Sequence, residues 1–359
     1  MINRLQITMQ KKILHIFRDF GVNNGGMVVT RRNSLSLRRI FNDNYSSYPI
    51  INRHGLIAKF KQFISLFHNL YGGITYEDVN EILRILKDDN FTHVFIDSSS
   101  MGSIINQIKN QLPNIKIITF FHNFEYHLIG DIYTGFKKHI YLMLANKNEY
   151  HACQESDSCI CLNKRDESEI FKKYGRKSNY IIPVSLPDKF CPNYYSQNKY
   201  DLLFIGSYFG PNINGIKWFI NNILPSTNLR LCIVGSGMDA LDINKSNQIE
   251  VISDAKDLSE YYNSAKVVIM PIFSGSGMKV KTAEALMFGK YIISTPEGVE
   301  GYETNSMDVS VVSSKQQFID AIKNIPQLPM YSKKNRQLFL ETYSDIKTHQ
   351  IFKNLFNTL

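Results

Sequence analysis

The chain has 359 residues, of which 43% are hydrophobic and 12% aromatic, and it carries a formal net charge of +9. This length is more than one ordinary hydrophobic core needs and suits two domains, and the apolar content excludes a largely disordered chain. No stretch reaches the roughly 18 consecutive apolar residues of a membrane span, and the N-terminal sequence MINRLQITMQKK lacks the apolar segment of a secretory signal. We therefore expect a cytoplasmic protein.

The first half of the chain alternates short apolar runs with stretches of helical spacing. A Gly-rich turn, residues 23–26, follows the first apolar run and precedes a helix expected to end near Phe41. Residues 76–87 place apolar side chains at helical spacing, and Ser98–Ser100 offer caps for a helix that follows. Strands are expected at residues 12–17, 92–97, 115–121, 158–162 and 180–183.

The second half repeats this alternation. Such a pattern is typical of parallel sheets covered by helices on both faces. The polar stretch 184–199, which contains prolines, separates the two series, so the sequence predicts an α/β protein with two Rossmann-like domains. In this half, strands are expected at residues 201–205, 229–234, 266–270 and 291–294, and helices near 212–223, 258–263, 278–288 and 335–359.

Positive charge is concentrated near the N-terminus. A field of this kind attracts phosphates, anionic lipid surfaces or nucleic acid, although an ordinary solvated face explains it equally well. No nucleic-acid-binding motif accompanies the charge, so we expect no nucleic-acid partner. Between residues 31 and 61 a single acid, Asp43, accompanies seven basic residues: Arg31, Arg32, Arg38, Arg39, Arg53, Lys59 and Lys61.

The cysteines are five in number, and three of them cluster at Cys153, Cys159 and Cys161. A Cys-x-Cys pair in a strand directs both sulfur atoms to one face, but it does not supply the tetrahedral ligand set that zinc prefers. We expect free thiols, mostly buried, and no metal site.

The residues that follow each strand are the candidates for ligand binding, because ligands of open parallel sheets bind beyond the carboxyl ends of the strands. These positions are polar or small in this sequence. They are Gly25 and Gly26, His122, Gly206 and Ser207, Gly235, and residues 274–279.

The segment from Val267 to Gly301 has the most specific pattern. A strand leads to Pro271 and a small flexible loop, and a helix opens near Met278. Glycines let the backbone approach a ligand, and the first N–H groups and the dipole of a helix favour an anion. Two lysines in the first turn strengthen such a site. The predicted anion-binding residues are Ser274, Gly275, Ser276, Gly277, Met278, Lys279, Val280 and Lys281.

This segment resembles the donor-binding segment of retaining glycosyltransferase family 4, within the GT-B superfamily. The resemblance is carried by Pro271, the Gly-rich loop, Glu284-Ala285, Gly289 and Gly298. It is closest to a subset, with a Gly-rich loop here, that builds capsules and O-antigens.

Further segments of the chain extend the resemblance. They are IGSYFGPNINGIKWF at 205–219, LCIVGSG at 231–237, CICLNKRDESEIFKKYG from Cys159, and YIIPVSLP from Tyr180.

The resemblance implies a GT-B fold, in which two Rossmann-like domains face each other across a cleft. The N-terminal, acceptor-side domain would comprise residues 1–186, and the donor-binding domain residues 187–337. The last helix, about 338–359, would cross back onto the N-terminal domain.

Site residues follow from the positions that match the family. Glu284 corresponds to the Glu that holds the donor ribose hydroxyls, and a carboxylate suits a vicinal diol because both hydrogen bonds are charge-assisted. Ser276 stands where the family usually has another Glu, so a negative charge beside the transferred sugar is missing. His122 corresponds to a histidine that contacts that sugar. The remaining residues are the donor-side Gly26, Gly206, Ser207 and Gly235, and the acceptor-side Gly25, Glu125 and Arg31.

The resemblance implies a glycosyltransferase that moves a sugar from a nucleotide-sugar, with UDP favoured over GDP, to a saccharide or lipid-linked acceptor. Retention of configuration is expected from the family. We expect neither cofactor nor metal ion: the chain has no Asp-x-Asp, and helix termini and lysines can stabilise the departing diphosphate. The basic stretch would dock the protein on the anionic inner face of a membrane or on a lipid-pyrophosphate acceptor.

Other functions remain open at this stage. The serine at position 276 also suits a non-catalytic subunit or chaperone of an active transferase. A GT-B-like epimerase would need acid and base carboxylates that no motif supplies. An NAD enzyme is disfavoured because residues 21–26 do not form Gly-x-Gly-x-x-Gly.

Overall fold

The computed structural model describes residues 11–19, 21, 25–51, 53–191, 198–244, 246–275 and 277–359. The chain forms two compact units. The N-terminal unit comprises residues up to Ile182 together with Ile351–Leu359, and the C-terminal unit is Pro183–Gln350. The boundary therefore lies before residue 186, and the returning segment begins after residue 338.

The N-terminal unit contains a parallel sheet of six strands in the order β2-β1-β3-β4-β5-β6. Each strand predicted in this half is present, although the predicted strand at 180–183 is reduced to two partly buried residues. β2 was not expected, since its sequence YSSYPII combines two serines with a proline, and the strand lies at the sheet edge. The strands are β1 (Ile13–Asp19), β2 (Tyr45–Ile51), β3 (His93–Ile96), β4 (Lys116–Phe121), β5 (Ser158–Cys161) and β6 (Tyr180–Ile181).

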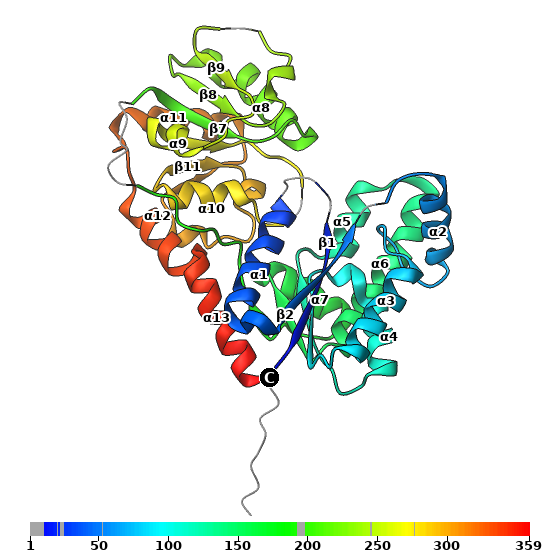
Figure 1. Ribbon diagram of the computed structural model, residues 1–359. Helices are drawn as coiled ribbons and strands as arrows, with labels where there is room; N and C mark the ends of the chain where they lie inside the picture. The colour runs from blue at the N-terminus through cyan, green and yellow to red at the C-terminus, as the bar shows by residue number, and fades with distance from the viewer. Residues whose placement is uncertain are drawn as a thin grey trace, which may run out of the picture. The chain divides into compact units, whose positions relative to one another are not determined.

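Helices cover the two faces of this sheet (Figure 1). Helix α3 (Tyr76–Asp88) begins at a capping box, in which the Thr75 and Asp78 side chains each bond the other's backbone N–H. Its apolar stripe packs with α4 and the strands in one buried core. The other helices are α1 (Gly25–Phe41), α2 (Leu56–Leu66), α4 (Gly102–Gln111), α5 (Glu125–Ile132), α6 (Gly135–Glu155) and α7 (Lys164–Tyr174).

The C-terminal unit contains a second six-stranded parallel sheet, in the order β12-β11-β10-β7-β8-β9 (Figure 1). The two predicted Rossmann-like domains are thus confirmed. Its strands are β7 (Tyr200–Ile205), β8 (Leu231–Val234), β9 (Ile249–Ile252), β10 (Ala265–Met270), β11 (Tyr291–Ser294) and β12 (Val309–Val311). Its helices are α8 (Gly210–Asn222), α9 (Ser259–Ser264), α10 (Val280–Met287), α11 (Lys315–Lys323) and α12 (Lys333–Leu338).

The prediction of one continuous C-terminal helix is wrong. A π-helical turn (Phe339–Tyr343) follows α12, and the last helix, α13, spans Asp345–Thr358. The break occurs because Leu186 pairs with the chain there: its N–H donates to the Tyr343 carbonyl at 2.9 Å, and its carbonyl accepts from Asp345 N–H at 3.0 Å.

The end of α13 returns to the N-terminal unit, as predicted. There the Phe352 ring lies 5.8 Å from the Phe95 ring, and the Phe356 ring lies 4.9 Å from Phe41. In the described part of the chain, no helix combines the length and the hydropathy that crossing a bilayer requires.

Candidate functional site

Two loops at the carboxyl edge of the C-terminal sheet meet at glycines. The loop after β7 carries Gly206 and the exposed Ser207, and the loop after β8 carries Gly235. A Cβ atom on Gly235 would lie 1.8 Å from the Gly206 carbonyl oxygen, so only glycine allows this approach. The structure thereby brings three predicted donor-side residues together.

The loop after β10 leads into α10. Ser274 and Gly275 are exposed, whereas Gly277 and Met278 are buried. The helix begins at Val280, later than the predicted Met278, because Lys279 has an extended backbone and occupies the N-cap position. Ser276 lies outside the described residues. Thr282 N–H donates to the Lys279 carbonyl at 3.0 Å, so the groups of this first turn that a ligand at the loop could bind are the N–H groups of Val280 and Lys281.

The two predicted lysines lie in different electrostatic surroundings. Lys279 Nζ donates to Glu297 Oε1 at 2.6 Å and to the Gly277 carbonyl at 3.0 Å. Lys281 Nζ instead donates to Asn212 Oδ1 at 2.8 Å and lies 5.0 Å from the centre of the Phe204 ring. Among the described residues, no carboxylate forms an ion pair with Lys281.

Burial lowers the pKa of Lys281 to about 7, and the nearby Glu284 carboxylate opposes that shift. Because its charge is costly to bury and is not paired, Lys281 has more to gain from an incoming phosphate than Lys279 does.

Glu284 lies on α10 and is held by a tyrosine. Tyr262 Oη donates to Glu284 Oε2 at 3.0 Å, and the Tyr262 ring stacks on Phe288 with centroids 4.7 Å apart. Burial raises the pKa of Glu284, and the Tyr262 hydrogen bond and Lys281 lower it. No described residue donates to the second carboxylate oxygen, so that atom can accept from a ligand.

Asn212 connects the separate loops, although sequence reasoning did not select it. Its Nδ2 donates to the Ser207 carbonyl at 3.0 Å, and its Oδ1 accepts from Lys281. Its position in the first turn of the helix after Gly206 was the available signal. Asn212 thus fixes Lys281 relative to the loop after β7.

In the N-terminal unit, His122 follows β4 and is bonded to a buried aspartate. The His122 Nε2 and Asp97 Oδ1 atoms are 2.7 Å apart. Asp97 also contacts His15 Nε2 at 3.1 Å through Oδ2 and accepts from Asn33 Nδ2 at 2.9 Å through Oδ1. Burial by itself raises the pKa of Asp97. The contacts with His122 and His15 lower this pKa by more, so the net pKa of Asp97 is well below the usual range. An ionised Asp97 therefore orients His122.

The predicted basic stretch is not one uniform surface. Arg32 is buried, with its guanidinium 5.5 Å from the centre of the Phe120 ring, and burial lowers its pKa to about 9 while Asp97 opposes the shift. Arg53 pairs with Asp78 at 2.7 Å. Lys61 pairs with Glu77 at 2.6 Å. Arg31, Arg38 and Arg39 on α1 and Lys59 on α2 are also exposed.

The predicted acceptor-side residues fall on two helices. Gly25 and Gly26 are exposed and form the first turn of α1, rather than a turn before it. Glu125 begins α5, where its N–H donates to Glu149 Oε1 at 2.8 Å. Glu149 is buried, and burial together with the charge of Glu125 raises its pKa to about 8. Burial also raises the pKa of Glu125, and the positive charge of Arg18 and the neighbouring His122 partly offset this rise.

The cysteines in the structure are free thiols, and all but Cys191 are buried. Burial raises the pKa of Cys159 to about 11, so this thiol is protonated and inert at neutral pH. No group of three or more His, Cys, Asp or Glu residues suited to a metal ion occurs among the residues that the structure describes.

Sequence comparison places the C-terminal unit in a known family. Residues 199–327 match the model of the family described as Glycosyl transferases group 1. The chain is also 25% identical over 309 residues to a Klebsiella pneumoniae protein described as an uncharacterized 44.6 kDa protein in the cps region. That alignment covers 77% of this chain and 76% of the relative.

Solved structures share the fold of the whole chain. Anabaena HepE in complex with UDP-glucose is similar with a TM-score of 0.68 and 11% identity, over 97% of this chain and 100% of that one. WaaG, a glycosyltransferase involved in lipopolysaccharide biosynthesis, is similar with a TM-score of 0.65 and 16% identity, over 94% and 99% of the two chains. Residues 199–327 thus form a glycosyl transferases group 1 domain, and with the GT-B fold of the chain they identify it as a glycosyltransferase.

Proposed function

We propose that this glycosyltransferase uses a UDP-sugar as donor and transfers the sugar to a saccharide or lipid-linked acceptor, with retention of configuration. The observation that carries the proposal is the grouping of Lys281, Glu284 and the first turn of α10 beside the loops after β7 and β8. Anabaena HepE, which has this fold, was solved in complex with UDP-glucose. Retention rests on the family resemblance alone.

In this proposal Glu284 accepts hydrogen bonds from the two ribose hydroxyls, using the oxygen that Tyr262 leaves free. Lys281 and the N–H groups that open α10 bind the diphosphate. As the bond between sugar and phosphate breaks, negative charge grows on the leaving diphosphate, and these groups stabilise it in the transition state. No metal ion or cofactor is required by this arrangement.

His122 would bind the donor sugar. Because its Nε2 faces the ionised Asp97, Nε2 carries a proton and donates to that carboxylate, and Nδ1 is the nitrogen left to bond a sugar hydroxyl. The Asp97 carboxylate would thus set both the orientation of the ring and the nitrogen that faces the substrate.

The product would belong to a surface polysaccharide or related glycoconjugate. Two likenesses support this: the relative from the cps region of Klebsiella pneumoniae, and WaaG, which is involved in lipopolysaccharide biosynthesis.

Peripheral association with an anionic membrane face is a further part of the proposal. Exposed cations on α1 and Lys59 on α2 would supply the attraction to anionic lipid. Liposome flotation tests it: binding to anionic but not neutral vesicles is expected, and equal recovery with both would contradict it.

Thermal unfolding in the presence of UDP, GDP, TDP, CMP or NAD tests the donor assignment. A ligand at 100 times its Kd adds about 2.7 kcal/mol to the free energy of unfolding. We expect stabilisation by UDP that Glu284→Ala removes. Stabilisation by a different nucleotide would replace UDP as the donor base, and no response to any of them would favour a non-catalytic partner of another transferase.

A further inference from the structure

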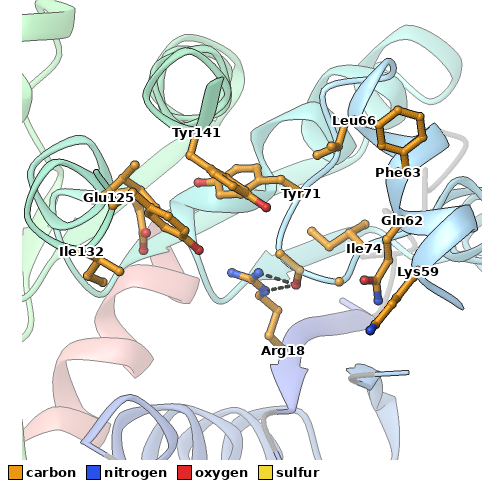
Figure 2. Close-up of a pocket in the computed structure, with 14 residues that line it drawn as sticks. Arg18, Lys59, Gln62, Phe63, Leu66, Tyr71, Ile74, Glu125, Ile132 and Tyr141 are labelled. Carbon is orange, nitrogen blue, oxygen red and sulfur yellow. Dashed lines mark hydrogen bonds between the residues drawn. The ribbon is translucent and has the colours of Figure 1, made fainter. Parts of the chain in front are cut away.

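A cavity of about 620 Å³ lies within the N-terminal unit, which contributes all of its lining residues. Its walls come from the end of β1, from α2, from the loop at residues 70–74, and from α5 and α6. In Figure 2, Arg18 lies on one side, Tyr71 and Tyr141 on the opposite side, and Phe63 and Lys59 toward the α2 edge. Of the site residues predicted from the sequence that the structure describes, Glu125 lines this cavity and the others do not.

One wall of the cavity is aromatic. Tyr133 and Tyr141 stack with ring centroids 4.5 Å apart and an interplanar angle of 17°, and the Tyr71 ring lies 6.3 Å from Tyr141. Aromatic faces carry partial negative charge, so they attract the polarised C–H groups on one face of a sugar ring. The wall therefore suits a saccharide.

A buried hydroxyl on this wall lacks a partner among the described residues. The Tyr71 side chain is 5% exposed, and its Oη makes no hydrogen bond to any described residue. Leaving a buried hydroxyl without a partner costs free energy, and a ligand hydroxyl would remove that cost. The Glu125 carboxyl lines the same cavity and provides an acceptor for further hydroxyls.

Two cations face the side opposite the aromatic wall. Arg18 is fixed in place: its Nε donates to the Gly72 carbonyl at 3.0 Å and its Nη1 to Ser100 Oγ at 3.2 Å. Gly72 has φ +69°, and a Cβ atom there would lie 1.2 Å from Arg18 Nη2, so this contact requires glycine. Lys59 is exposed at the rim and forms no ion pair within the described part of the chain. An anionic group at the rim would complement these charges.

An unusually apolar surface adjoins the same rim. Phe63 lines the cavity and is itself 57% exposed, and the outer face of α2 continues with Leu56, Ile57, Phe60 and Phe67, which are 65–86% exposed. Water-soluble proteins rarely expose so many large apolar residues on one helix without a partner. A hydrocarbon chain that leaves the cavity beside Lys59 would cover this face.

We propose that this cavity binds the acceptor, and that the acceptor is a saccharide attached through a phosphate to an apolar chain. The sugar lies against Tyr133 and Tyr141, with its hydroxyls bonded to Tyr71 and Glu125. The phosphate lies at the rim between Arg18 and Lys59, and the chain follows the exposed face of α2. This assignment rests on the proposed transferase function and specifies the acceptor class.

Three small probes separate the three contacts, because each carries two of the three chemical groups. Glucose 1-phosphate has the sugar and the phosphate, octyl β-glucoside has the sugar and a chain, and farnesyl phosphate has the phosphate and a chain. Binding of each, with octyl glucoside below its micelle concentration, is measured by ligand-observed NMR titration of the full-length protein. The variants are Tyr71→Phe, Lys59→Gln and Phe63→Ser, with Tyr150→Phe on the exposed side of α6 as a matched control.

Each variant should weaken binding of the two probes that carry its contact, by roughly fivefold, and leave the third unchanged. Tyr71→Phe should affect the two sugars, Lys59→Gln the two phosphates, and Phe63→Ser the two probes with chains. If Phe63→Ser changes nothing and glucose 1-phosphate binds best, the ligand is a free sugar phosphate and the lipid assignment is wrong.

If all variants bind the three probes as the control does, the assignment of this cavity as the acceptor site is wrong. UDP binding is measured in the same samples. If the variants behave alike but the protein binds UDP, the acceptor proposal fails and the donor proposal stands. If the wild-type protein does not bind UDP, the donor proposal is refuted.

Discussion

The two units carry their candidate sites in different ways. In the C-terminal unit most polar groups come from one stretch, residues 274–284, with Asn212 and Tyr262 added from neighbouring helices. In the N-terminal unit the cavity draws on Arg18, Lys59 and Tyr71 and on two further helices. A nucleotide diphosphate can be bound by a loop and a helix N-terminus, which are contiguous in sequence. An acceptor of particular shape needs side chains from several segments, which leave no common motif.

Within the C-terminal unit, the two lysines of α10 make a second contrast. Both stand at the same loop, yet Lys279 is neutralised by Glu297, whereas the contacts of Lys281 among the described residues are to a neutral amide and an aromatic ring. The first is suited to holding the loop, and the second to holding a phosphate.

The largest effect is expected for Lys281→Met. Removing a cation that stabilises charge on the leaving group costs about 10²–10³-fold in kcat. The measurement is UDP release from UDP-sugars in steady state, with circular dichroism to verify folding. A fall of less than about threefold would show that the phosphate is bound elsewhere.

Asp97→Asn should lower the free energy of unfolding by about 3 kcal/mol, because it removes the buried charge to which His15, His122 and Asn33 are hydrogen-bonded. Since the pKa of Asp97 is lowered in the fold, its contribution is complete above the unfolded value near 4 and is lost as pH falls below it. Urea titrations should thus show a constant gap between wild type and variant from about pH 5 to 7 that shrinks below about pH 4. A gap that does not change with pH would contradict an ionised Asp97.

Glu284→Gln should weaken UDP binding by roughly thirtyfold, which corresponds to about 2 kcal/mol for hydrogen bonds to a charged acceptor. Calorimetric titration with UDP measures the change. Glu260→Gln, on the exposed surface of α9, is the matched control and should bind as the wild type does. Equal losses in both variants would remove Glu284 from the site.

UDP affinity should fall as pH rises above about 7, by up to tenfold per pH unit, because Lys281 loses its proton there and must regain it to bind phosphate. Lys281→Arg should bind UDP with little dependence on pH in this range, since arginine stays charged. Titrations at several pH values between about 7 and 8.5 test this. Parallel pH profiles for wild type and variant would assign the dependence to another group.

The smallest effect is expected for Lys279→Met. Because Glu297 and the Gly277 carbonyl hold the Lys279 ammonium, its loss should change UDP affinity by less than about threefold. A loss comparable to that of Lys281→Met would end the distinction between the two lysines.

Strands with uniform apolar sequences could be predicted from the sequence, and so could the two sheets that they form. β2 could not, since it is an edge strand that begins with polar residues and includes Pro49. The break before α13 was also invisible, because it depends on Leu186, far away in the sequence.

The candidate site was partly accessible from the sequence. The candidate residues were chosen because ligands bind beyond the carboxyl ends of parallel strands. The same rule points to Asp97, at the end of the stretch THVFID, although it was not selected from the sequence. The pairing of Lys279 with Glu297 and the cavity around Tyr71 depend on tertiary packing, so no local sequence pattern predicts them.

The central claim is that the C-terminal unit binds the UDP donor and the N-terminal unit binds the acceptor. Hydrogen–deuterium exchange of the full-length protein, with and without UDP, tests this claim most directly. The account predicts that UDP slows exchange in the segments around 206–212, 235–237 and 277–284 and leaves the α2 and 70–74 segments unchanged. Protection confined to the α2 and 70–74 segments, or no protection at saturating UDP, would contradict it.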